Sequence, residues 1–189
     1  MRGALLIGGK SSRMGQPKHL LEVAGEPLGQ RLCNLLRKLT GHQPLISGEG
    51  DISGWGLDRV ADREQGAGPL SALLGLFDAH PNETWLVLAT DMPAMNENAL
   101  SWLIKQAAAS EKPTTWPRFI DRHSGEPLAA IYKPDIIPIM ENAWQEGIRG
   151  PTRAVQAKYR HQPEIPLHLE TVFKNANTPD EWQELIASL

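Results

Sequence analysis

Short apolar runs alternate along the chain with stretches in which apolar residues recur at helical spacing. Residues 4–7 and 85–89 are continuously apolar, as strands buried on both faces of a sheet are, and further strand signals lie at 45–46, 59–61 and 128–132. Amphipathic helices are expected between these runs, where apolar residues stand three or four positions apart. Strands that alternate with covering helices are typical of an α/β fold.

Several of the expected helices carry signals at their ends. The apolar stripe 28–39 stops before Gly41, and Pro69 precedes the stripe 70–77 at a first-turn position, where a proline is tolerated. Residues 178–181 combine an N-cap threonine, a proline at the first helical position and a glutamate at the third, so the last helix is expected to begin there. Further helices are expected at 100–107, 136–144 and 154–155.

The chain of 189 residues shows no internal repeat, low-complexity tract or long linker. A chain of this length can bury a full hydrophobic core without disulfides or structural metals. We therefore expect a single domain over residues 1–189, with a three-layer α/β/α architecture and a mostly parallel sheet. The strand order does not follow from the pattern.

The composition of the chain limits its possible binding partners and its expected cellular location. Nineteen Lys and Arg against 22 Asp and Glu give a net charge of −3, which argues against the basic face that nucleic-acid binding needs. The single cysteine, Cys33, cannot form an internal disulfide, and no apolar run approaches the roughly 20 residues of a membrane-spanning helix. The apolar start of the chain ends at Gly8, too early for a signal peptide. We expect a cytoplasmic protein that binds neither nucleic acid nor membranes.

Residues 8–18 combine glycines, hydroxyls and basic side chains directly after the first expected strand. A P-loop would need glycine at Ala4, and a dinucleotide-binding fingerprint would need glycine where Ser11 and Ser12 stand, so neither motif is present. Glycines let backbone N–H groups approach an anion closely, and hydroxyls and cations strengthen its binding, so the loop suits a polyphosphate. A glycine-rich turn with solvated basic residues is the alternative.

Asp91 lies just beyond the clearest strand signal, at 85–89. In open α/β sheets, ligands bind at this carboxyl edge of the strands. A lone carboxylate there can hold Mg²⁺ while substrate phosphates and water complete the coordination sphere. The alternative is an aspartate that shapes the turn before Pro93.

Residues 6–18, LIGGKSSRMGQPK, resemble the LxGGxSxRMGxxK signature of the molybdenum cofactor guanylyltransferase (MobA) family. Further segments resemble family elements in the same order, at 66–70 (GAGPL), 91–93 (DMP), 126–132 (EPLAAIY) and 173–179 (FKNANTP). The resemblance covers residues 3–186. It implies a nucleotidyltransferase fold of the GT-A/Rossmann-like type.

The resemblance also implies a reaction, in which GMP is transferred from GTP to the terminal phosphate of molybdopterin, giving molybdopterin guanine dinucleotide and pyrophosphate. The acceptor phosphate has a second pKa of about 6, so it is largely a dianion at neutral pH and needs no enzymic base. Catalysis then rests on positioning, cations and a metal, and the implied cofactor is Mg²⁺. The implied partners are GTP, molybdopterin, and the molybdoenzymes or chaperones that receive the product.

The matching motifs imply roles for individual residues. Lys18 and Arg13 would be the catalytic cations on the β- and γ-phosphates, and Asp91 the metal ligand. Asn177 resembles an asparagine that approaches the same metal, with a turn residue before the last helix as the alternative. The nucleotide-binding positions implied by the family pattern are Leu6, Gly8, Gly9, Ser11, Lys18, Asp62, Gly68, Asp91 and Asn177. Asp62 matches a position used for the base or ribose, and a solvated loop is its alternative.

Other polar residues have weaker assignments. Residues 118–126, with Arg149, Gly150 and Arg153, are candidates to meet the pterin and its phosphate. Histidines such as His19 and His123 are expected to be structural or loop residues rather than catalysts, and Cys33 is expected to be a small buried apolar side chain.

Two departures from the family pattern leave other interpretations open. Ile7 stands where the family often has alanine, and Pro17 precedes Lys18 as in cytidylyltransferases that act on the same cofactor. The glycines at 8–9 and the GPL segment at 68–70 favour guanine. The alternatives are a CTP-dependent molybdenum cofactor cytidylyltransferase, another MobA-like nucleotidyltransferase that activates a sugar or polyol phosphate, and a non-catalytic, nucleotide-binding carrier of the cofactor.

Overall fold

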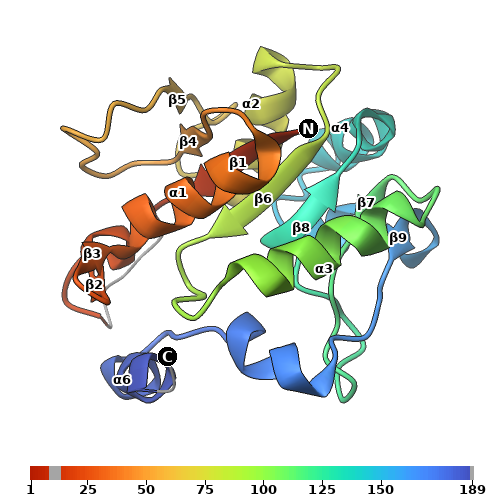
Figure 1. The fold of residues 1–189 in the computed structure, drawn as a ribbon. Helices are drawn as coiled ribbons and strands as arrows, with labels where there is room; N and C mark the ends of the chain where they lie inside the picture. Colours follow the sequence, from red (N-terminus) through yellow and green to blue (C-terminus); the bar gives the residue numbers. More distant parts are fainter. Residues whose placement is uncertain (9–13, 188–189) are drawn as a thin grey trace.

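The computed structural model describes residues 1–8 and 14–187, and these residues form a seven-stranded sheet covered by helices (Figure 1). The strand order is β5-β4-β1-β6-β8-β7-β9. Among these seven strands, only β8 runs against the others, which confirms the mostly parallel sheet. The strands span Arg2–Leu6 (β1), Leu45–Ser47 (β4), Arg59–Val60 (β5), Trp85–Ala89 (β6), Thr114–Thr115 (β7), Ala129–Tyr132 (β8) and Arg160–His161 (β9).

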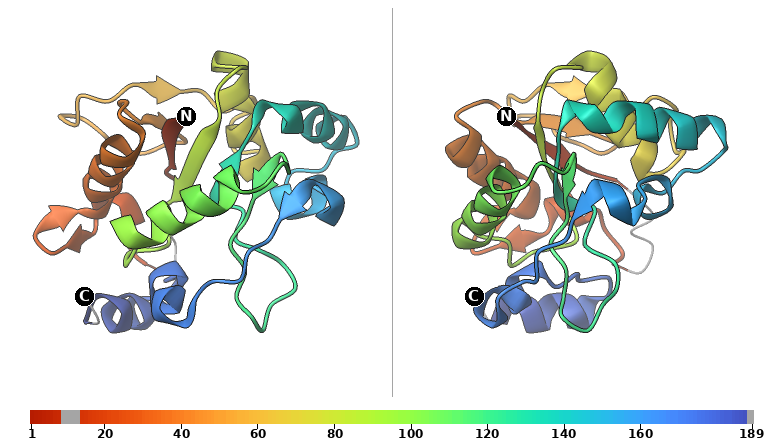
Figure 2. Two further views of the ribbon diagram at one scale, coloured as in Figure 1. Left: turned by 45° about the vertical axis from the view of Figure 1, so that its right-hand side comes forward. Right: turned by 90° about the vertical axis from the view of Figure 1, so that its right-hand side faces the viewer.

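Helices cover both faces of this sheet, which confirms the expected three layers (Figure 2). One face is packed against α1 (Leu28–Thr40) and α3 (Glu97–Ala108). The opposite face is packed against α2 (Pro69–Ala79), α4 (Ile137–Gln145) and the short α5 (Pro151–Ala154). The C-terminal helix α6 (Pro179–Ala187) adds Trp182 and Leu185 to the first core, and it lies below the sheet in the view of Figure 1.

The apolar run 4–7, in β1 and directly after it, shows why these positions are all apolar. Leu5 and Ile7 belong to the core under α1 and α3, whereas Ala4 and Leu6 belong to the core under α2 and α4. The strand pairs with β4 on one side and with β6 on the other, so it has neither a solvent-facing side nor a free edge. Alternation of side chains across a central strand therefore demands apolar residues throughout.

The predicted helix ends are confirmed. Gly41 ends α1 in the left-handed region with φ 72°, a conformation that costs glycine little, and Pro69 occupies the first turn of α2. At the start of α6, the Glu181 carboxylate accepts a hydrogen bond from the Thr178 backbone N–H at 3.1 Å, and the Thr178 hydroxyl accepts one from the Glu181 N–H at 3.3 Å. This reciprocal pair is the capping box that the sequence predicts.

The sequence pattern did not predict the shortest elements. These are the two-residue strands β7 and β9 at the sheet edge, the hairpin of β2 (Glu22–Val23) and β3 (Glu26–Pro27), and the 3₁₀ helices η2 (Lys18–Leu20), η3 (Pro134–Ile136), η4 (Ala157–Tyr159) and η5 (Leu167–Phe173). Apart from the seven-residue η5, these segments are two or three residues long and carry no measurable periodicity, so tertiary contacts decide them. Across residues 1–8 and 14–187, no helix combines the length and the apolar character needed to cross a membrane.

Candidate active site

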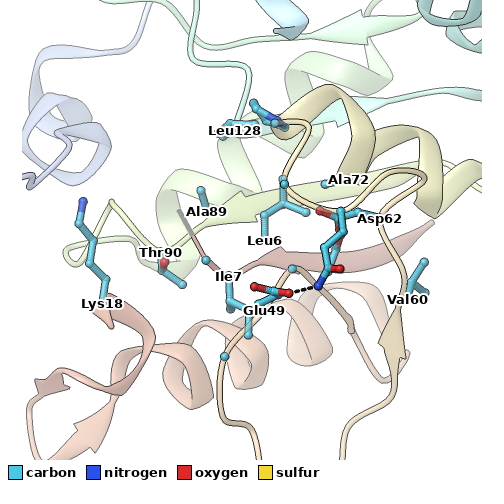
Figure 3. A pocket seen from close by; sticks show the side chains of 18 of the residues that line it. Leu6, Ile7, Lys18, Glu49, Val60, Asp62, Ala72, Ala89, Thr90 and Leu128 are labelled. Carbon is cyan, nitrogen blue, oxygen red and sulfur yellow. Dashed lines mark hydrogen bonds between the residues drawn. The ribbon is translucent and has the colours of Figure 1, made fainter. Parts of the chain in front are cut away.

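A pocket of about 970 Å³ opens at the carboxyl ends of the parallel strands β1, β4, β5 and β6. Its lining includes seven of the residues implied by the family resemblance: Leu6, Gly8, Lys18, Asp62, Gly68, Asp91 and Asn177 (Figure 3). Gly9, Ser11 and Arg13 lie outside the described residues. The pocket is therefore built from segments that are far apart in the sequence, as ligand sites at this edge of α/β sheets are.

Three of the implied residues meet at one end of the pocket. The Lys18 ammonium donates to the Ala176 carbonyl at 2.5 Å and to the Asn177 side-chain oxygen at 3.0 Å. The Ala176 N–H in turn donates to the Asp91 carbonyl at 2.7 Å. These bonds join the end of β6, the 3₁₀ turn η2 and the segment before α6, so Lys18, Asp91 and Asn177 share one corner of the site.

The burial of the Asp91 carboxyl group is only partly compensated within the described part of the chain. Its Oδ1 atom is buried and accepts no hydrogen bond from the described residues. Burial raises the pKa of Asp91, and the positive charge of Lys18 offsets part of that rise. No group of three His, Cys, Asp or Glu side chains among residues 1–8 and 14–187 could hold a metal ion. A cation at Asp91 would therefore need further ligands from substrate or water.

A second end of the pocket is formed by the loops after β4 and β5. The Ser47 hydroxyl donates to Asp62 Oδ1 at 2.6 Å, which orients the Asp62 carboxylate in the lining. Gly48 has φ 98°, and a Cβ at this position would lie 1.8 Å from the Ile7 carbonyl oxygen. Only glycine allows this close approach of the loop to the end of β1. This contact holds the loop after β4 directly against the end of β1.

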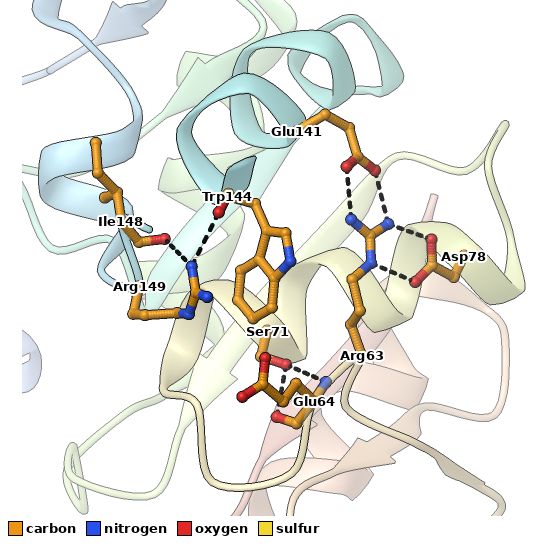
Figure 4. Close-up of polar contacts among 8 residues, drawn as sticks. All are labelled: Arg63, Glu64, Ser71, Asp78, Glu141, Trp144, Ile148 and Arg149. Atoms are coloured by element: carbon orange, nitrogen blue, oxygen red, sulfur yellow. Dashed lines mark hydrogen bonds and ion pairs between the residues drawn. The ribbon is translucent and has the colours of Figure 1, made fainter. Parts of the chain in front are cut away.

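The segment 61–68 is held from behind by a charged cluster on α2 and α4 (Figure 4). The Arg63 guanidinium lies between Asp78, at 2.8 Å from Nε, and Glu141, at 2.6 Å from Nη1. The Ser71 hydroxyl accepts from the Glu64 N–H at 2.7 Å and donates to the Glu64 carbonyl at 2.8 Å. The sequence analysis missed Arg63, because its partners stand 15 and 78 positions away and form no local motif.

Residues 3–163 match the family model described as a MobA-like NTP transferase domain. The chain belongs to this family. It is therefore a nucleotidyltransferase, and the predicted fold type and enzyme class are confirmed. Lys18 and Asp91 lie within the matched residues and Asn177 lies beyond them, and the role of each residue stays a prediction.

Named relatives agree with this family assignment. The chain is 35% identical to a molybdenum cofactor guanylyltransferase from Pseudomonas fluorescens, over 93% of this chain and 88% of the relative. It is 30% identical to a molybdenum cofactor biosynthesis bifunctional protein from Synechocystis, over 82% of this chain but only 45% of that longer protein. The fold is similar to that of molybdopterin-guanine dinucleotide biosynthesis protein A from Archaeoglobus fulgidus, with a TM-score of 0.76 at 22% identity, covering 100% of this chain and 98% of that one.

The basic residues expected to meet an acceptor are engaged within this MobA-like domain. Arg118 pairs with Glu164 at 2.5 Å, and Arg122 pairs with Glu126 at 3.0 Å. Burial raises the pKa of Glu126, while Arg122 and a hydrogen bond from Asn175 lower it in part. Any acceptor phosphate that uses Arg122 would compete with Glu126 for it.

Arg149 also has partners within the protein, and it lies beside Gly68 of the pocket lining. Its guanidinium stacks on the Trp144 ring at 3.8 Å and donates to the Trp144 carbonyl at 3.0 Å (Figure 4). Its own carbonyl accepts from the Leu70 N–H at 3.1 Å and lies 3.3 Å from where a Cβ of Gly68 would be. These contacts shape the start of α2 in the MobA-like domain, and contact of Arg149 or Arg153 with a pterin stays a prediction.

The expectations for His19 and Cys33 can be compared with the structure. His19 is buried, its Nε2 lies 3.1 Å from the Asp51 carbonyl, and burial lowers its pKa, which fits a structural role. Cys33 is buried in α1, as predicted, and burial raises the pKa of its thiol to about 12. The pocket also has lining residues that the sequence analysis did not single out, among them Glu49, Arg59, Gln65 and Thr90.

Proposed function

We propose that this chain transfers GMP from GTP to the phosphate of molybdopterin, giving molybdopterin guanine dinucleotide and pyrophosphate. The observation that carries the proposal is the meeting of Lys18, Asp91 and Asn177 at the rim of a pocket large enough for a nucleotide. The relative named molybdenum cofactor guanylyltransferase, 35% identical over most of both chains, supports the choice of nucleotide and acceptor. The cytoplasmic location expected from the sequence stays a prediction.

The chain itself supplies charge and position. Lys18 places an ammonium group beside Asn177 and the end of β6, where the β- and γ-phosphates of GTP would lie. Gly8 has φ 104°, a conformation that costs glycine little, and lines the pocket just after β1. Arg13, Gly9 and Ser11 are proposed to complete the phosphate contacts, as the family resemblance implies. Positioning of two anions is the main task of such a site.

The residues at Asp91 fit a divalent cation, for which we propose Mg²⁺. Asp91 Oδ1 is a buried oxygen without a partner among the described residues, and the Asn177 amide oxygen lies in the same corner of the site. Hard cations such as Mg²⁺ prefer oxygen ligands and take the rest from phosphates and water. When bound, the cation would supply positive charge to the reacting phosphates. Asp91 would hold it, with Asn177 beside it.

No general base is part of the proposal. The molybdopterin phosphate is largely a dianion above about pH 6, so it can attack without losing a proton to the enzyme. His19 is buried against the Asp51 carbonyl rather than directed at Lys18 and Asp91, which agrees with this account.

The test is turnover of molybdopterin with GTP, CTP, ATP or UTP in the presence of Mg²⁺, with the dinucleotide product identified by mass. We expect GTP to exceed the other nucleotides at least about tenfold in kcat/KM. A preference for CTP would refute the proposal in favour of a cytidylyltransferase. Nucleotide binding without any product would favour the carrier.

A matched pair of lysine variants tests the phosphate site. Lys18→Ala should lower turnover by about 10²-fold or more with little change in melting temperature, because it removes a charge that acts on the reacting phosphates. Lys38→Ala removes an exposed lysine of α1 that pairs with Glu97 of α3 and is not among the described pocket lining, so it should leave turnover unchanged. Equal turnover in the two variants would remove Lys18 from the mechanism.

A further inference from the structure

The pocket is electrically uneven from one end to the other. Lys18 lies at one end of the lining with Asp91, and the carboxylates of Glu49 and Asp62 lie away from Lys18 (Figure 3). Arg59 also lines the pocket, where its guanidinium donates to the carbonyls of Gly48 and Gly50. Phosphates suit the end with Lys18, so the base and ribose of a bound nucleotide would face the two carboxylates. Carboxylates accept hydrogen bonds and cannot donate them, so this end favours a base that presents N–H donors.

Glu49 is presented to the pocket by a tightly fixed turn. The Arg59 guanidinium donates to the carbonyls of Gly48 and Gly50, the latter at 2.7 Å. The Glu49 backbone lies against Gly8, where an added Cβ would meet Glu49 N and O at 3.4 Å. The turn is thereby joined to the end of β1 on one side and to β5 on the other. The position of the Glu49 backbone is therefore set by several independent contacts.

The Glu49 carboxylate already holds an amino donor of the chain. Gln65, from the loop after β5, donates its side-chain amide N–H to Glu49 Oε1 across the pocket, the contact drawn as a dashed line in Figure 3. Both side chains are exposed and line the pocket, so a ligand can replace this bond. Asp62 differs, because its Oδ1 accepts from the buried Ser47 hydroxyl.

The four bases differ in the hydrogen-bond donors that they can offer to such a carboxylate. Guanine presents N1–H and the 2-amino group side by side, which matches the two oxygens of one carboxylate. The N–H₂ of a glutamine amide resembles that 2-amino group as a donor. Adenine and cytosine place an acceptor nitrogen beside their amino group, and uracil offers a single N–H between two carbonyls. Only guanine offers two adjacent donors.

We propose that Glu49 is the residue that recognises guanine, accepting hydrogen bonds from N1–H and the 2-amino group in place of Gln65. The inference rests on the proposed function, since it takes GTP as the substrate. Asp62, already bound to Ser47, is then left to the ribose side of the pocket. Glu49 acts on nucleotide choice and not on the reacting phosphates.

The experiment compares GTP, inosine triphosphate, which lacks the 2-amino group, and xanthosine triphosphate, which has a carbonyl there. Wild-type protein should bind GTP at least about tenfold more tightly than inosine triphosphate, because a hydrogen bond to a charged group is lost. Glu49→Gln should lose this preference and improve binding of xanthosine triphosphate relative to GTP, because an amide can donate to the carbonyl. Glu64→Gln, a neighbouring exposed carboxylate that is not among the described pocket lining, should behave as wild type.

The outcomes separate the inference from the proposed function. If Glu49→Gln keeps the full preference for GTP over inosine triphosphate, the inference is overturned, and loss of that preference in Asp62→Asn would give the role to Asp62. If the wild-type protein makes product with GTP in the same series, the proposed function stands regardless. If wild-type protein binds CTP in preference to GTP, both are refuted. Melting temperatures of each variant show whether a loss of binding reflects unfolding.

Discussion

Replacing Gly48 by alanine tests how the pocket wall is built. A Cβ at residue 48 would lie 1.8 Å from the Ile7 carbonyl oxygen and 2.9 Å from its carbon, so the backbone must shift. The shift would strain the bond from the Ile7 N–H to the Ser47 carbonyl, now 2.8 Å, which joins the ends of β1 and β4. The residue also has φ 98°, where an L-residue is strained by about 1–2 kcal/mol.

Gly54→Ala is the matched control for backbone strain. Gly54 lies in the same loop with φ 79°, but nothing lies within 4 Å of its added Cβ. The free energy of unfolding of Gly54→Ala should therefore fall only by the strain of the left-handed backbone, about 1–2 kcal/mol. That of Gly48→Ala should fall by the same amount and by about 2 kcal/mol more, because the added Cβ overpacks the contact with Ile7. For a chain of this length, that difference corresponds to a melting temperature about 4–8 °C lower than in Gly54→Ala.

The assay is thermal unfolding of both variants and the wild type, with and without GTP and Mg²⁺. GTP should raise the melting temperature less in Gly48→Ala than in Gly54→Ala, because the displaced turn carries Glu49. Equal melting temperatures for the two variants would show that the wall yields at no cost. The close contact between Gly48 and Ile7 would then have no part in shaping the pocket.

Three further outcomes follow from the same structure. Asp91→Asn should lower turnover at least about 10²-fold, because it removes the charge proposed to hold the cation. It should not lower the melting temperature, because burial already disfavours the charged carboxyl group. Unchanged turnover would exclude Asp91 from the mechanism. The rate at saturating GTP and Mg²⁺ should fall below about pH 6 in a one-proton step, set by the acceptor phosphate, and His19→Gln or His123→Gln should not move that step. Glu181→Gln should lower the melting temperature at pH 7, by an amount that shrinks as the pH falls below the unfolded pKa of the glutamate. Hydrogen bonds from Asn177 and Thr178 lower the pKa of Glu181, so its stabilisation exists above the unfolded pKa and is lost as the pH falls through the folded one.

The main elements could be predicted because their signals are local. Residues 4–7 and strand β6 are apolar at every position, which follows from burial on both faces of the sheet. Helices α1 and α6 carry their end signals within a few residues. Strand order could not be predicted, because it depends on which helix covers which face. Strands β7 and β9 were missed because two residues cannot show a period of two.

The residues of the candidate site also fall into those with a local sequence signal and those without one. Lys18, Asp91 and Asn177 could be named because each stands in a contiguous motif beside a strand or helix end. Glu49 and Arg63 could not, since their importance depends on partners contributed by other loops and helices. Arg63 contacts Asp78 and Glu141 across two elements, which is visible only when α2 and α4 are placed side by side. Local motifs locate the end of the pocket that carries Lys18, and long-range packing builds the end that carries Glu49 and Asp62.

The electrostatics at Asp91 predict that nucleotide and metal bind as a pair. Burial raises the pKa of Asp91 and the Lys18 charge offsets part of this, so the charged carboxylate depends on nearby positive charge. Phosphates placed against Lys18 would weaken that compensation unless a divalent cation accompanies them. GTP should therefore bind wild-type protein about tenfold or more tightly with Mg²⁺ than with EDTA, and calorimetry should find the same factor for Mg²⁺ with and without GTP. In Asp91→Asn the coupling should shrink, because a neutral amide needs no compensation. Mg²⁺ complexes GTP in solution to the same extent whichever protein is present. Only the difference in coupling between the wild type and Asp91→Asn therefore reports on the site. Coupling of equal size in Asp91→Asn would place the cation elsewhere in the pocket.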